Sequence, residues 1–126
     1  METILDNDNL LRRVPFIDPN YVRDDGTLTS LAFQLKKGES GLSVNIERLT
    51  TYVDSIQDVR RFRLYYLKAR QPKELGLACL HDPQPANNAH ALIKGEITKK
   101  ISRELAKSAK RIGCVELWRP LVNLLL

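Results

Sequence analysis

His90 is the residue whose type and position in this chain best suit chemistry. It follows a turn that starts at Asp82-Pro83 and lies at the start of a predicted strand. An imidazole can act as a general base or donate a hydrogen bond to a phosphate if a carboxylate or backbone carbonyl fixes its tautomer. Asp82, across the turn, is one candidate for that role. The alternative is a structural histidine bonded to the turn, because no nucleophile can be assigned beside it.

The neighbouring residues His81, Asp82 and His90 have side chains that zinc and iron accept as ligands. Their spacing matches no tight ligand motif, and the two histidines fall on different predicted strands. We therefore expect no metal site, and the sequence does not identify a cofactor.

Arg12, Arg13 and Ser43 indicate a second kind of chemistry. In enzymes that transfer ADP-ribose or handle NAD, an early-strand arginine or histidine and a serine motif in the middle of the chain hold the dinucleotide. The order here is compatible with that layout, and a guanidinium can bind a phosphate through two hydrogen bonds. No glutamate in a recognisable motif follows, so the analogy rests on order alone. The alternative is a structural arginine pair on an edge strand, paired with the acidic N-terminal segment.

The segment 99–112 has the helical pattern with the clearest physical meaning. Its apolar residues share one arc of the predicted helix: Ile101, Leu105, Ala109 and Ile112. The cations share the opposite arc: Lys99, Lys100, Arg103, Lys107, Lys110 and Arg111. Thr98 is expected to cap the helix at its start, and Gly113 to follow its end. The basic arc could bind the phosphates of a nucleic acid or an acidic protein, and its alternative is an ordinary solvated face without aromatic residues to stack on bases.

Charge is unevenly distributed along the 126 residues. The net charge is +5, but residues 1–60 hold 7 Lys/Arg against 10 Asp/Glu, whereas residues 61–126 hold 13 against 5. This asymmetry favours an anionic partner for the second half, or complementarity between the two halves.

Several classes of protein are excluded by what the sequence lacks. It contains no phosphate-binding Walker loop, no G-x-G-x-x-G, no H-E-x-x-H and no G-x-S-x-G. Its longest apolar run, 121–126, is interrupted by Asn123 and is far shorter than the ~20 residues of a membrane-spanning helix. Cys79 and Cys114 form no Cys-x-x-Cys pair and no secretory leader is apparent, so we expect free thiols and a cytoplasmic location.

The order of predicted elements indicates an α+β fold in one domain. We expect a small mixed or antiparallel sheet of about five strands, with the 99–112 helix packed on one face. Strands are predicted at 10–15, 29–35, 42–44, 62–66, 76–80 and 89–95, and short helices at 46–49, capped by Asn45, and 52–59. Residues 1–9 are expected to be loosely held, and 114–126 form an apolar segment.

The apolar C-terminal segment is either packed on the core or a surface for self-association. The side chains that would form this surface are Trp118, Leu121, Val122, Leu124, Leu125 and Leu126.

Three patterns, taken in order, resemble a family of small uncharacterised bacterial proteins. They are Leu-Arg-Arg-Val-Pro at 11–15, Ser-Leu-Ala-Phe at 30–33 followed by Leu-Ser-Val at 42–44, and Asp-Pro-Gln-Pro at 82–85 leading into 89–95. The resemblance extends over residues 10–112. It implies a bacterial, cytoplasmic protein with one compact domain, and it carries no activity with it.

Two hypotheses for function follow. The first is a non-catalytic bacterial interaction module that binds an anionic partner, an acidic protein or a nucleic acid, through Lys99, Arg103, Lys107 and Lys110. The second is a small enzyme or nucleotide-binding protein of the NAD-handling kind, centred on His90 with Arg12 or Arg13. The second requires His90, Arg12 and Ser43 to meet at one pocket.

Overall fold

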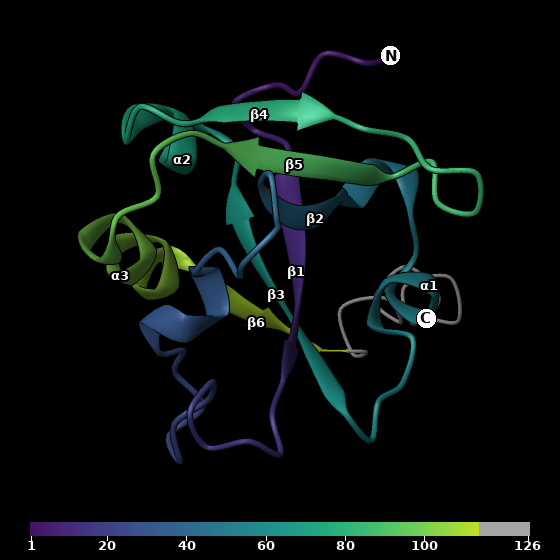
Figure 1. Cartoon of the computed structure of the whole chain (residues 1–126). Coiled ribbons are helices and arrows are strands. Elements are labelled where there is room, and N and C mark those ends of the chain that lie inside the picture. Colours follow the sequence, from purple (N-terminus) through teal and green to yellow (C-terminus); the bar gives the residue numbers. More distant parts are fainter. Residues whose placement is uncertain (114–126) are drawn as a thin grey trace, which may run out of the picture.

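The computed structural model describes residues 1–113 of the chain as an α+β fold built on one open antiparallel sheet (Figure 1). The six strands follow the order β4-β5-β2-β1-β3-β6. They are β1 (Asn9–Pro15), β2 (Leu42–Ile46), β3 (Phe62–Lys68), β4 (Ala78–His81), β5 (His90–Lys94) and β6 (Lys110–Ile112). The helices are α1 (Tyr52–Ile56), α2 (Arg70–Glu74) and α3 (Lys99–Ser108), with 3-10 helices η1 (Ser30–Phe33) and η2 (Glu47–Leu49). The predicted self-association surface of residues 118–126 lies outside the described residues.

β1 is an interior strand that pairs with its two neighbours over different lengths. It pairs with β3 along its whole length, from Asn9↔Lys68 to Pro15↔Phe62. Its pairing with β2 is confined to Leu10↔Ile46 and Leu11↔Asn45. Beyond Leu11 the ladder between β1 and β2 stops, and the sheet opens between these two strands.

The main core is one cluster of buried residues from the sheet, η1 and α3, and Figure 1 shows η1 and α3 close to each other. Phe33 of η1 and Leu105 of α3 are fully buried in this cluster with Leu42 of β2. α3 packs against η1, and the buried Ser102 hydroxyl donates to the Phe33 carbonyl at 2.8 Å. Thr98 caps α3 as predicted, because its hydroxyl accepts from the Ile101 N–H.

The predicted end of the 99–112 helix was wrong. α3 stops at Ser108, Ala109 is extended, and residues 110–112 form β6 against β3, where Leu64 pairs with Ile112. The exposed edge of β3 supplies this segment with backbone hydrogen bonds, and Ile112 packs on the small cluster around Leu11 and Leu64. Lys110 and Arg111 consequently belong to an edge strand and not to the basic face of a helix.

The predicted strand at 29–35 was also wrong. Residues 30–33 form η1, in which the consecutive residues Ala32 and Phe33 are both buried while Leu31 is 39% exposed. A strand would turn Ala32 and Phe33 to opposite faces, whereas the 3-10 turn buries both. The predicted strands at 10–15, 42–44, 62–66, 76–80 and 89–95 are confirmed to within two residues at each end.

The N-terminal segment, predicted to be loosely held, makes specific contacts. Ile4 is buried in the main core, and Arg48 forms ion pairs with Glu2 at 2.6 Å and Asp8 at 2.9 Å. Burial alone would raise the pKa of Asp8, but the hydrogen bonds from Arg48 and the Leu5 N–H hold it below its ordinary value. Within residues 1–113, no helix is both long and apolar enough to cross a membrane.

Candidate functional site

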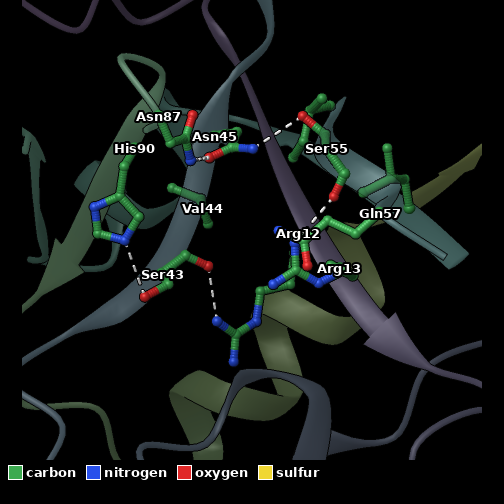
Figure 2. Close-up of a pocket in the computed structure, with 11 residues that line it drawn as sticks. Arg12, Arg13, Ser43, Val44, Asn45, Ser55, Gln57, Asn87 and His90 are labelled. Carbon is green, nitrogen blue, oxygen red and sulfur yellow. Dashed lines mark hydrogen bonds between the residues drawn. The ribbon is translucent and has the colours of Figure 1, made fainter. Parts of the chain in front are cut away.

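A polar pocket of about 300 Å³ occupies the opening between β1 and β2 (Figure 2). Four residues singled out from the sequence line it: Arg12, Arg13, Ser43 and His90. They come from β1, β2 and β5, three strands that are far apart in the sequence. The pocket exists because the β1–β2 ladder ends at Leu11 and the arginines follow immediately.

At the wall of the pocket, the Arg12 side chain makes a hydrogen bond to β2 where the backbone bonds between β1 and β2 have ended. The Ile46 N–H donates to the Ala89 carbonyl, next to β5. Successive residues of an antiparallel strand direct their N–H and C=O groups to its two neighbours in turn. Since Ile46 bonds towards β5, the N–H and C=O of Ser43 are directed towards β1. There the Arg12 Nη1 donates to the Ser43 carbonyl at 2.8 Å, and its Nε donates to the Ala32 carbonyl at 2.9 Å. Burial lowers the pKa of Arg12, but a guanidinium stays charged at neutral pH.

Arg13 points to the opposite face of β1 and contributes a second guanidinium to the same pocket. Its Nη1 donates to the Ser55 carbonyl at 3.1 Å, and the guanidinium lies 5.2 Å from the centre of the Phe62 ring. Burial lowers the pKa of Arg13. The suggested pairing of these arginines with the acidic N-terminal segment was wrong, because that segment pairs with Arg48 and Lys73 and β1 is not an edge strand.

His90 is held from both of its ring nitrogens. Nδ1 lies 3.0 Å from the Asp82 carbonyl oxygen and 3.2 Å from the Asp82 carboxylate, as the sequence suggested for a residue across the turn. Nε2 lies 3.2 Å from the Ser43 hydroxyl, at the mouth of the pocket. His90 and Ser43 are diagonal neighbours on paired strands, because Asn45 is opposite His90 and Ser43 is opposite Leu92.

A chain of side-chain hydrogen bonds fixes the back wall of the pocket. The Asn87 amide donates to the Asn45 amide oxygen at 2.8 Å, and the Asn45 amide donates to the buried Ser55 hydroxyl at 2.9 Å. It therefore joins the β4–β5 turn, β2 and α1 (Figure 2). Sequence reasoning missed Asn45 because it was interpreted as a helix cap, and it missed Asn87 because asparagine is an ordinary residue in a turn.

Gln57 lines the same pocket with a strained backbone. It has φ 63° and ψ −53°, and the Asp58 N–H bonds to the Ile56 carbonyl across it at 2.7 Å. This is the rare form of γ-turn, which side-chain-bearing residues adopt at a cost of ~1–3 kcal/mol. Strain of this kind is found most often at binding and catalytic sites.

We expect Gln57→Gly to raise the free energy of unfolding by about 1 kcal/mol, because glycine adopts this conformation without the strain while making the unfolded chain more flexible. Urea denaturation measures the change. Gln57→Ala is the control, since it removes the side chain and keeps the strain. Equal midpoints for the glycine and alanine variants would contradict the assignment of strain to this residue.

The remaining candidates lie apart from the pocket. Lys99, Arg103 and Lys107 are exposed on α3, and Lys110 is exposed on β6. Lys107 lies 3.8 Å from the Glu104 carboxylate. The sequence placed all six cations on one helix, whereas α3 itself carries only Lys99, Lys100, Arg103 and Lys107.

His81 and Cys79 on β4 are also outside the pocket. His81 accepts from the Glu2 N–H through Nδ1 and bonds to the Asn88 carbonyl through Nε2, so both nitrogens are engaged. Burial raises the pKa of the Cys79 thiol to about 11, which keeps it protonated at neutral pH. Across residues 1–113, no three His, Cys, Asp or Glu side chains gather closely enough to hold a metal ion.

Comparison with protein-family models, with curated proteins and with solved structures gave no match. The resemblance to small bacterial proteins therefore stays a prediction, and function has to be inferred from the described residues of the chain.

Proposed function

We propose that the pocket between β1 and β2 binds a small phosphorylated ligand, a phosphate ester or the diphosphate part of a nucleotide. The observation that supports this most directly is the presence of Arg12, Arg13, Ser43 and His90 around one opening. Two guanidiniums supply charge and paired donors for phosphate oxygens, while the hydroxyl and imidazole add further hydrogen-bonding groups.

The two arginines are pre-organised for such a ligand. Arg12 is fixed by two backbone carbonyls, and Arg13 by the Ser55 carbonyl and the Phe62 ring. Each guanidinium has five N–H donors, so both keep donors for a ligand after these contacts. Side chains already held in position lose less entropy on binding.

A second proposal keeps the exposed face of α3 as the functional surface. Lys99, Lys100 and Arg103 are solvent-exposed there and would bind an acidic protein or a nucleic acid electrostatically, without catalysis. Both proposals include a bacterial, cytoplasmic protein, which the resemblance to small bacterial proteins implies. The pocket is favoured because its cations are fixed and converge, whereas an exposed helical row of lysines is common on solvated surfaces.

Calorimetric titration with inorganic pyrophosphate and with ADP-ribose separates the two proposals. Arg13→Gln should raise the dissociation constant about ten-fold or more, because a charge-assisted hydrogen bond is worth ~1.5–3 kcal/mol and 1.4 kcal/mol is ten-fold. Arg13 is exposed, so this variant is expected to fold. Binding should also weaken as sodium chloride is added.

The matched control is the triple variant Lys99→Glu, Arg103→Glu, Lys107→Glu, which reverses the exposed charge of α3. It should leave binding of both probes to the pocket nearly unchanged. Loss of binding in this variant, with normal binding by Arg13→Gln, would favour the α3 surface; binding of neither probe by the unmodified protein would exclude the phosphate pocket.

A further inference from the structure

We propose that Ser43 is a nucleophile activated by His90 and Asp82, so that the pocket transfers a phosphoryl group from a phosphate ester or anhydride. This inference rests on the proposed function for its substrate class. The activation of Ser43 is assigned to these three residues and can be tested separately from phosphate binding.

The hydrogen bonds of His90 determine its tautomer. Nδ1 faces the Asp82 carbonyl at 3.0 Å and the Asp82 carboxylate at 3.2 Å, and both groups only accept hydrogen bonds. Nδ1 must therefore carry a proton. In the neutral ring Nε2 then has the lone pair, and the Ser43 hydroxyl, 3.2 Å away, donates to it. A serine, a histidine and an aspartate in this sequence of contacts have the roles of nucleophile, base and orienting group.

The aspartate is itself positioned. The Gln84 amide donates to its carboxylate at 3.0 Å, and the Asp82 N–H donates to the His90 carbonyl at 2.9 Å. Asp82 and His90 thus belong to the two ends of one hairpin connection between β4 and β5. The contacts are local to that hairpin, while Ser43 is brought to them by the pairing of β2 with β5.

Ser43 is accessible, and it lines the same pocket as Arg12 and Arg13. It is exposed and lines the pocket, and its own carbonyl accepts from Arg12. Because its backbone is directed towards the opening between β1 and β2, the Ser43 N–H points to the same space as the Arg12 guanidinium. Negative charge that develops on a reacting phosphoryl group would be stabilised there. Two arginines at the site favour an anionic phosphoryl group over a neutral ester as the substrate.

The reaction has two balanced steps. Ser43 Oγ forms a bond to phosphorus, the bond from phosphorus to the leaving oxygen breaks, and the hydroxyl proton passes through His90 Nε2 to that oxygen. A water molecule then attacks the phosphoserine while His90 accepts its proton. The Ser43 oxygen leaves and regains the proton from His90, which releases phosphate or a phosphate monoester and restores the site.

Labelling with diisopropyl fluorophosphate tests the nucleophile without relying on anion binding by the two arginines. This neutral probe loses fluoride when an activated serine attacks phosphorus, and peptide mapping by mass spectrometry locates the adduct. We expect modification at Ser43, none after Ser43→Ala, and labelling at least ~100-fold slower in His90→Gln. The exposed Ser40 in the neighbouring loop is an internal control for an unactivated hydroxyl.

The role of Asp82 is tested by a measurement that would not change if Asp82 were purely structural. Asp82→Asn keeps the backbone carbonyl bonded to Nδ1, so it should retain the melting temperature but label about ten-fold more slowly. Asp82→Glu, which restores the charge, should recover part of the rate. Absence of an adduct, equal modification of Ser40, or insensitivity to His90→Gln in a folded variant would overturn the proposal, even if pyrophosphate binds normally. Labelling of Ser43 without pyrophosphate binding would support the nucleophile and refute the phosphate pocket.

Discussion

Leu105→Asp is expected to unfold the protein. Leu105 is fully buried in the main core, and truncating such a leucine to alanine already costs ~2–5 kcal/mol. Aspartate adds an unpaired carboxylate in an apolar environment, so the total should approach or exceed the ~5–15 kcal/mol that stabilises an ordinary domain. Circular dichroism should show loss of the cooperative thermal transition.

Arg103→Asp is the matched control, because it introduces the same side chain on the exposed face of the same helix. Its free energy of unfolding should change by no more than ~0.5 kcal/mol. Leu105→Met, which nearly conserves volume, should cost less than about 1.5 kcal/mol. If the Leu105→Asp variant folds with an unchanged melting temperature, α3 does not belong to the core.

The parts of the fold that could be predicted are those in which the residue pattern is compatible with only one kind of secondary structure. β5 alternates half-buried and buried side chains along its length, and Thr98 begins a helix in the usual way. The end of α3 could not be predicted, because the apolar residues of 99–112 fit a helix as well as a helix followed by a short strand. What decides is the free edge of β3, more than 40 residues earlier in the chain, and local spacing contains no information about it.

The same limit applies to the site. Arg12, Arg13, Ser43 and His90 could be singled out by residue type, but their meeting depends on the pairing of β2 with β5 and on the early end of the β1–β2 ladder. Asparagine and glutamine in turns are too common to signal a pocket wall. Had the antiparallel register of 42–44 and 89–95 been known, the diagonal contact of Ser43 with His90 would have followed.

Arg12→Met is expected to lower the free energy of unfolding by about 2–4 kcal/mol and to close or distort the pocket. Methionine keeps most of the apolar stem but leaves the carbonyls of Ala32 and Ser43 without their donor. Each unpaired buried acceptor costs ~1–3 kcal/mol, with the lower value for a carbonyl that water can reach. The opening between β1 and β2 would lose the group that spans it, so binding of pyrophosphate should fall more than in Arg13→Gln.

The comparison that isolates this role is Arg13→Met. Arg13 is the neighbouring arginine, but it bonds to one carbonyl, that of Ser55, and lies on the exposed face, so its replacement should cost roughly 1 kcal/mol or less. Arg12→Lys should fall between the two, because an ammonium group on an unbranched stem cannot reproduce two divergent N–H bonds. Urea denaturation of the three variants gives the ranking. If Arg12→Met and Arg13→Met have the same midpoint, the guanidinium of Arg12 does not hold β1 and β2 together, and the pocket must owe its shape to the asparagine chain on its other wall.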